Sequence, residues 1–277
     1  MRTAVSALLV ILALVVAAVA GPALWLQKNV IDQAGFVQLA GPLGSNKSFQ
    51  EGLSALAASQ ATASVDLPPQ LTDLAAALIQ SAAQSIYTEP GYDAAWTETL
   101  KRSHALTFAA AGNKDIQGDL QLDIAPLVAL VAAKVSDSTS VPLATPKDVV
   151  VALEQPELAR LLPAATTLGG WAGWMAFIAV DLLVLALVAA RRRSLTLILA
   201  AAGLATVALV WLFASGVVQS VLTGMATGPA AAQQFGVELG ALARESWQGG
   251  INATFVIAGV LALAGVATLI IKRRRTT

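Results

Sequence analysis

Residues 169–218 read GGWAGWMAFIAVDLLVLALVAARRRSLTLILAAAGLATVALVWLFASGVV, and this stretch decides the fold. It contains two apolar runs, each long enough for a helix of about 20 residues that crosses a bilayer. The basic triplet Arg191–Arg193 separates the two runs. Because basic residues in short loops stay on the cytoplasmic side, the stretch is predicted to be a membrane hairpin with its turn in the cytoplasm.

Two further runs of the same kind lie outside this hairpin, Thr3–Leu26 and Ile251–Ile271. A basic residue precedes the first of them and a basic cluster follows the second. With four spans, all of these basic residues fall on one side of the membrane, where they are predicted to set the topology and contact lipid headgroups. They are Arg2, Arg191, Arg192, Arg193, Lys272, Arg273, Arg274 and Arg275.

The predicted fold class is therefore a mainly α membrane protein with four transmembrane helices and a helix-rich extracytoplasmic domain of minor strand content. The order along the chain is a first transmembrane helix at 1–26, the extracytoplasmic domain at 27–168, a helix at 169–190, a cytoplasmic loop at 191–194, a helix at 195–218, an extracytoplasmic loop with an amphipathic helix at 219–250, a helix at 251–271 and a cytoplasmic tail at 272–277.

Composition supports this fold class. Apolar residues make up 56% of the chain and charged residues only 12%, about half the charged fraction of a soluble domain. The net charge of zero conceals an acidic stretch between Lys28 and Arg160, which carries fourteen acidic and eight basic residues. The chain has no cysteine, which excludes disulfides and thiolate metal sites.

Four tryptophans fall at or beside the predicted outer ends of the spans: Trp25, Trp171, Trp174 and Trp247. Indole prefers the headgroup level of a membrane, so these residues are predicted to form an interfacial belt. The alternative is that they pack among the helices.

The first span has two interpretations. Its basic start, apolar core and Ala18-Val19-Ala20 pattern resemble a signal peptide that is cleaved before Gly21. However, the apolar character continues to Leu26, beyond the usual 7–15 residues of a signal-peptide core, which favours an uncleaved anchor.

Local patterns predict the elements of the extracytoplasmic domain. Ser48–Glu51 is interpreted as a capping box that starts a helix. Further helices are expected from Pro69, over Tyr92–Ala110, 126–135 and 156–162, strands at Asp119–Ile124 and 149–153, and loops at 59–66 and 137–147. The amphipathic helix within 219–250 has two open interpretations, a helix on the membrane surface and a helix packed against the domain.

Asp181 is the sharpest candidate for a functional residue. It lies about ten residues from both Trp171 and Arg191, near the predicted midplane, where a carboxylate costs at least about 2.5 kcal/mol. Thr206 lies at similar depth and could donate a hydrogen bond to it. The hypotheses are a proton-linked or polar helix contact, or a protonated acid that only joins neighbouring helices.

No catalytic, cofactor or metal signature is found. His104 is the single histidine and lacks the partners of a triad or a zinc site, so it is interpreted as a surface or helix-face residue. Asp115, Asp119 and Asp123 recur every four residues but lack the glycine and glutamate of a calcium loop. In a strand they would share one face, expected to be the solvated one.

Three segments carry a family resemblance: Leu120–Pro126, Leu67–Pro69 and Leu161–Pro163. With the overall layout, they make the chain similar to uncharacterised actinobacterial multi-pass membrane proteins that have an N-terminal span, a helix-rich extracytoplasmic domain and a three-span C-terminal part. The resemblance implies no activity and no functional residues.

The functional expectation is a non-catalytic, integral plasma-membrane protein with both termini in the cytoplasm. Its extracytoplasmic domain is expected to sense, bind or scaffold an envelope partner on the outer face, with no nucleic-acid partner. The alternative is an accessory subunit of a transporter or channel that uses Asp181.

Overall fold

The computed structural model describes residues 2–63, 69–111, 121–139, 147–152, 156–225 and 230–274. Contacts divide the chain into two units. The bundle comprises Met1–Val30, Ala164–Val221 and Ala243–Thr277, and the helical domain comprises Ile31–Pro163 and Leu222–Leu242.

Four long helices supply the bundle: α1 (Arg2–Leu26), α7 (Pro156–Ala189), α8 (Arg193–Met225) and α9 (Ala230–Arg274). Within the described residues, each holds a stretch long and apolar enough to cross a membrane. These stretches are Thr3–Ile31, Ala159–Ala189, Arg193–Gly216 and Gly236–Ile271. The prediction of a mainly α, multi-pass membrane protein is confirmed at this level.

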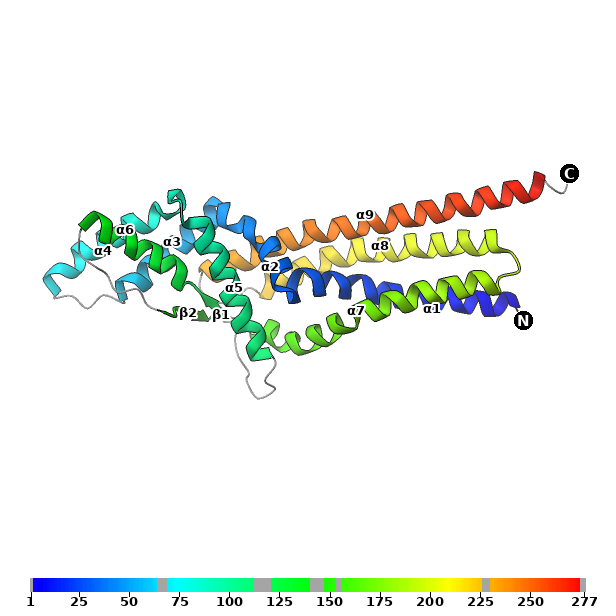
Figure 1. Cartoon of the computed structure of the whole chain (residues 1–277), viewed down its shortest axis with the longest axis horizontal. Helices are drawn as coiled ribbons and strands as arrows, with labels where there is room; N and C mark the ends of the chain where they lie inside the picture. Colours follow the sequence, from blue (N-terminus) through cyan, green and yellow to red (C-terminus); the bar gives the residue numbers. More distant parts are fainter. Residues whose placement is uncertain are drawn as a thin grey trace. The chain divides into compact units, whose positions relative to one another are not determined.

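The start of α1, the turn between α7 and α8 and the end of α9 all lie at one end of the bundle (Figure 1). This is called the basic end, because Arg191–Arg193 form the turn. Side chains on the outer surface of the bundle are strongly apolar. Phe213 is 76% exposed and Leu263 is 72% exposed, which suits hydrocarbon rather than water as the surrounding medium.

Small residues allow the helices of the bundle to approach closely. A side-chain carbon added at Gly203 of α8 would lie 2.2 Å from Leu14 of α1, and one added at Gly21 would lie 2.3 Å from Trp211. In lipid there is no hydrophobic driving force for helices to associate, so such close packing is a main source of the stability of the bundle.

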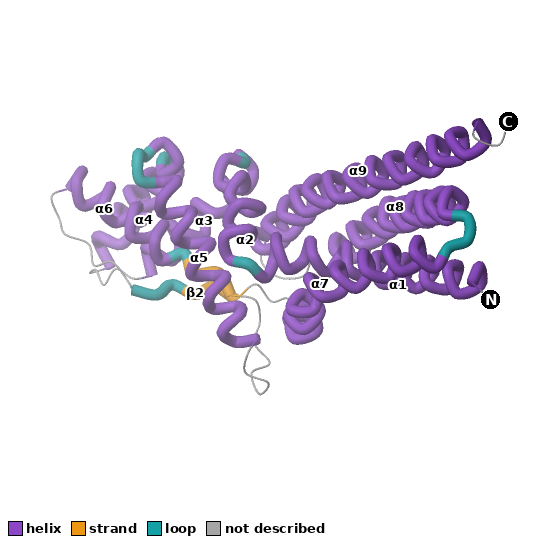
Figure 2. The backbone as a smooth tube through the Cα atoms, turned by 45° about the vertical axis from the view of Figure 1, so that its right-hand side comes forward, coloured by secondary structure: helices purple, strands orange, loops and turns teal. Residues whose placement is uncertain are grey.

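The helical domain is built mostly from helices, with one short pair of strands (Figure 2). The π-helical turn η1 (Gln27–Ile31), most of which belongs to the bundle, precedes it in the chain. The elements of the domain are α2 (Gln33–Ala40), the 3₁₀ segment η2 (Gly41–Ser45), α3 (Lys47–Ala63), α4 (Pro69–Gln84), the 3₁₀ segment η3 (Ile86–Thr88), α5 (Tyr92–Ala111), β1 (Gln121–Asp123), α6 (Ala125–Thr139) and β2 (Val150–Ala152).

One apolar core joins these elements. It is formed by fully buried residues of η2, α4, α5 and α6, including Leu43, Ile79, Leu100 and Val131. Leu239 and Leu242, in the first part of α9, pack against the same core. Of the two interpretations of the helix within 219–250, the structure therefore favours packing against the domain.

Two of the predicted helix starts can be compared directly. The helix predicted to open at Pro68-Pro69 is confirmed as α4, which begins at Pro69. The capping box at Ser48–Glu51 is wrong, because α3 already begins at Lys47 and Asn46 provides the cap: its Oδ1 accepts a hydrogen bond from the Phe49 amide at 3.1 Å. The short amide side chain satisfies a free amide of the first turn in the same way that Ser48 was expected to.

The two strands pair antiparallel, with Leu122 opposite Val151. The expectation that Asp123 lies on a solvated face is wrong, since it is 3% exposed. Its Oδ1 accepts hydrogen bonds from the Ala125 amide at 3.0 Å and the Val149 amide at 3.2 Å, so the carboxylate caps α6 and ties β2 to it. Asp115 and Asp119 lie outside the described residues.

Several predicted boundaries fall short because helices run further than the turn-forming residues indicate. The loop predicted at 59–66 is helical to Ala63, and the loop predicted at 137–147 is helical to Thr139. The separate helix predicted at 156–162 is the beginning of α7. The amphipathic helix predicted within the loop at 219–250 is the first part of α9, which starts at Ala230, and α8 extends into the predicted loop as far as Met225.

A tight contact holds η2 against α5. A side-chain carbon on Gly44 would lie 2.5 Å from Trp96, whose indole N–H donates to the Gly41 carbonyl at 3.0 Å. The Tyr92 hydroxyl donates to the Gly44 carbonyl at 2.9 Å, and burial raises the pKa of this phenol to about 12.

We therefore expect Gly44→Ala to destabilise the helical domain by about 1–3 kcal/mol, because the added methyl displaces the Trp96 ring. Gly41→Ala is the matched control, since nothing lies within 4 Å of the added carbon there. The readout is hydrogen exchange of the α5 amides, measured by mass spectrometry on the full chain in detergent. Equal exchange in the two variants would contradict the contact.

Candidate functional site

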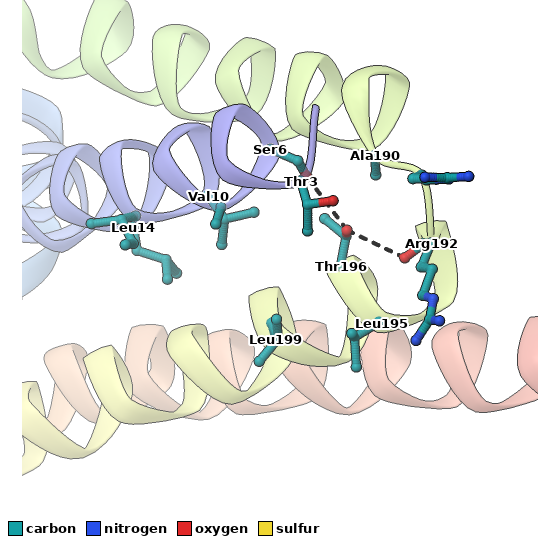
Figure 3. Close-up of a pocket in the computed structure, with 12 residues that line it drawn as sticks. Thr3, Ser6, Val10, Leu14, Ala190, Arg192, Leu195, Thr196 and Leu199 are labelled. Atoms are coloured by element: carbon teal, nitrogen blue, oxygen red, sulfur yellow. Dashed lines mark hydrogen bonds between the residues drawn. The ribbon is translucent and has the colours of Figure 1, made fainter. Parts of the chain in front are cut away.

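A cavity of about 770 Å³ opens at the basic end of the bundle (Figure 3). Its lining comes from the first half of α1, the α7–α8 turn and the first two turns of α8. We call it the basic-end cavity. Among its lining residues are Thr3, Ser6, Leu14, Arg191, Arg192 and Leu199.

Two buried hydroxyls form the polar part of this cavity. The Ser6 hydroxyl donates to the Ala186 carbonyl of α7 at 2.9 Å and lies 3.5 Å from the hydroxyl of Thr196 in α8. Ser6 is 4% exposed and Thr196 is 9% exposed. A hydroxyl in hydrocarbon must find a partner, so these contacts join three helices at one level.

The basic residues predicted to set the topology are placed as follows. Arg191, Arg192 and Arg193 are exposed, and in the part of the chain that the structure describes none of them forms an ion pair. Arg2, Lys272 and Arg273 lie at the described helix ends, Arg274 is exposed, and Arg275 falls outside the described residues.

The four tryptophans of the predicted belt separate into two kinds. Trp171 and Trp174 in α7 are 62% and 64% exposed, and their place in a headgroup layer stays a prediction. Trp25 and Trp247 instead pack edge to face with ring centroids 6.0 Å apart. Trp211, which was not assigned to the belt, lies 5.3 Å from Trp247, so these three rings pack among the helices.

A second cavity of about 450 Å³ adjoins the Trp25–Trp211–Trp247 cluster. The indole N–H groups are already engaged: Trp25 donates to Ser246 at 3.1 Å and Trp211 donates to the Ala18 carbonyl at 3.0 Å. Because the Trp25 and Trp211 donors are used and all three rings contact one another, this cluster is better explained as packing between α1, α8 and α9 than as a ligand site.

Asp181 lies on an exposed face of α7, where it forms no hydrogen bond or ion pair within the described ranges. Apolar side chains one turn away on either side are also exposed, with Phe177 at 65% and Val184 at 51%. The structure does not join Asp181 to Thr206. The Thr206 hydroxyl donates to the Ala202 carbonyl of its own helix at 3.0 Å.

In the helical domain, His104 is 7% exposed, so of its two interpretations the surface residue is wrong and the helix-face residue agrees with its place in α5. Its ring stacks on Phe108 with centroids 4.4 Å apart and tilts against Phe36 at 5.3 Å. Arg102 lies 3.8 Å from the buried Asp123 carboxylate and forms a closer ion pair with Glu98 at 3.0 Å. These polar side chains are occupied by contacts within the domain.

No group of three or more His, Asp or Glu side chains is placed to hold a metal ion across the ranges that the structure describes. The basic-end cavity, by contrast, is lined by two arginines without ion-pair partners among the described residues, by hydroxyl side chains and by apolar side chains. Sequence reasoning found Arg191 and Arg192 but missed Ser6 and Thr196, because the two hydroxyls are 190 residues apart in the chain. Their one signal is that each is a hydroxyl residue close to the basic start of an apolar run.

Comparison with protein-family models, with curated proteins and with solved structures finds no match to this chain. The similarity to actinobacterial multi-pass membrane proteins stays a prediction from sequence layout. Three features of the chain bear on its function: the basic-end cavity, the exposed face of α7 that holds Asp181, and the helical domain.

Proposed function

We propose that this chain is a non-catalytic, multi-pass protein of a bacterial plasma membrane, with its helical domain outside the cytoplasm. In this proposal the helical domain senses, binds or scaffolds an envelope partner, and the bundle holds it at the membrane. The basic end would then face the cytoplasm, as the retention of positively charged loops on that side predicts.

The burial of His104 is the observation that supports a non-catalytic role. Acid–base catalysis needs a side chain that can reach a substrate proton. The His104 ring is instead 7% exposed and enclosed by Phe36 and Phe108. Asp123, the most buried carboxylate among the residues that the structure describes, is bound to backbone amides. Both groups support the domain's packing, which favours a binding or scaffolding role.

The proposed orientation can be tested by labelling, because the chain has no cysteine of its own. Ser81 is an exposed residue of α4, and Ser194 lies in the first turn of α8 beside the basic triplet. We expect Ser81→Cys to react with a membrane-impermeant maleimide in intact cells. Ser194→Cys, an identical substitution, is expected to react only after permeabilisation. The reverse pattern would place the helical domain in the cytoplasm.

We expect His104→Phe to keep biological function, because phenylalanine preserves the stack with Phe108. The measurement is complementation of a strain that lacks the chain. Phe36→Leu is the control, since it disturbs the same aromatic contact without touching the imidazole. If His104→Phe fails to complement while Phe36→Leu succeeds at equal protein level, the histidine has a chemical role and the non-catalytic proposal is wrong.

A second candidate function is an accessory subunit of a transporter or channel, and the Asp181 face favours it. Trp174, Phe177, Val184 and Val188 are exposed on the same side of α7 as Asp181, at helical spacing. A lipid-facing carboxylate near mid-span is costly, so such residues are usually covered by a partner. The fitting partner is a helix that offers a hydrogen-bond donor at that depth.

We expect Asp181→Leu to weaken co-purification of that partner from detergent extracts roughly five- to thirty-fold, the range of one interhelical hydrogen bond. Asp181→Asn keeps a polar side chain and is expected to retain the partner. Val188→Ala trims the same face without removing a polar group and serves as the control. The readout is quantitative mass spectrometry of the captured proteins. Identical capture by Asp181→Leu and the unaltered chain would exclude this candidate.

A further inference from the structure

We infer that the basic-end cavity is a binding site for an anionic phospholipid. The inference is independent of the function of the helical domain, because every residue it uses lies in the bundle. It goes beyond the general attraction of basic loops to membranes, since it assigns the headgroup and the upper acyl chain to particular side chains.

The cavity changes polarity along its length in the order of a phospholipid. Arg192 lies at one end, the hydroxyls of Thr3, Ser6 and Thr196 come next, and Val10, Leu14 and Leu199 line the remainder (Figure 3). Arg191, the neighbour of Arg192 in the chain, also lines the cavity. Free inorganic phosphate would use only the first part of this surface. A lipid uses all of it.

Charge complementarity identifies the headgroup. Arg191 and Arg192 both line the cavity, and in the described part of the chain neither has an ion-pair partner. Guanidinium groups bind phosphate oxygens with two parallel hydrogen bonds. The start of α8 at Arg193 adds the positive end of a helix dipole close to the same place.

A hydroxyl can complete the contacts of the headgroup. The Thr3 hydroxyl makes no hydrogen bond to any described residue, so it is free to donate to a phosphate oxygen. Ser6 and Thr196 lie on the apolar side of the arginines, at the level of the glycerol backbone and ester groups of the proposed lipid. The Ser6 hydroxyl donates to the Ala186 carbonyl, so these contacts position the helices around the lipid rather than select among anionic headgroups.

The apolar part of the cavity is closed on one side by packing between helices. Leu14 lies against Gly203 of α8, where even one added carbon would be 2.2 Å away. The volume of about 770 Å³ is within the range of sites that enclose small molecules, about 300–1,000 Å³. It suits a headgroup with the first part of one acyl chain, whose remainder would continue into the bilayer.

Native mass spectrometry of the full chain in a non-ionic detergent tests the inference. The probes are phosphatidylglycerol and phosphatidylcholine with identical acyl chains, added over a range of concentrations. We expect phosphatidylglycerol to bind more tightly, and the double variant Arg191→Gln, Arg192→Gln to bind it about 30-fold more weakly, given about a fivefold effect per basic side chain near a charged lipid surface.

Two controls separate this site from diffuse attraction and from phosphate binding. Arg193→Gln with Arg274→Gln removes the same charge from residues that do not line the cavity, and it is expected to keep phosphatidylglycerol binding. Leu199→Trp fills the apolar part while leaving both arginines, and it is expected to lose the lipid. Because Leu199 is 55% exposed, this variant is expected to fold.

Three results would overturn the inference. One is equal binding of the two lipids by the unaltered chain. Another is equal weakening of phosphatidylglycerol binding by the cavity pair and by the charge-matched pair. The third is displacement of the lipid by inorganic phosphate at millimolar concentration together with unchanged binding by Leu199→Trp, which would assign the site to a free anion.

Discussion

Hydrocarbon offers no hydrogen-bond partner to a polar group, and this constraint explains both the secondary structure and the polar contacts of the bundle. Four apolar stretches can satisfy their own backbone only as helices, so the membrane part of the chain has no alternative secondary structure. The few polar side chains inside it then become decisive. Ser6 and Thr196 contact each other, and Ser6 donates to a carbonyl of α7, which joins three helices at one level. Asp181 forms no hydrogen bond or ion pair with any residue that the structure describes.

The two units solve the packing problem differently. In the helical domain, water drives burial of large side chains such as Leu100 and Leu127, and Trp96 fills the space that Gly44 leaves. In the bundle, the surrounding lipid is as apolar as the side chains. Close approach at Gly21 and Gly203 therefore replaces burial as the source of cohesion.

Hydropathy predicts the spans, Pro68-Pro69 predicts the start of α4 and period-two alternation predicts the first strand, because each signal depends on residues that are close in the chain. The Asn46 cap was missed because Ser48 matched a recognised motif two residues later. Phe108 lies one turn after His104 in α5, but the enclosure of His104 was missed because Phe36 comes from α2 and meets the ring only in the folded domain. The basic-end cavity was found only in part, since its arginines are marked by charge, whereas its hydroxyls come together only through the tertiary fold.

The contact between Ser6 and Thr196 also has a consequence for biosynthesis. The two residues are 190 positions apart, and a ribosome that adds about 5–20 residues per second needs roughly 10–40 s to make the chain between them. During that interval α1 is already synthesised, while the surface of α8 that receives it does not yet exist. The first helix must therefore wait in the membrane with its serine and its glycine face uncovered, which makes it a natural client for the cell's insertion machinery until the third span arrives.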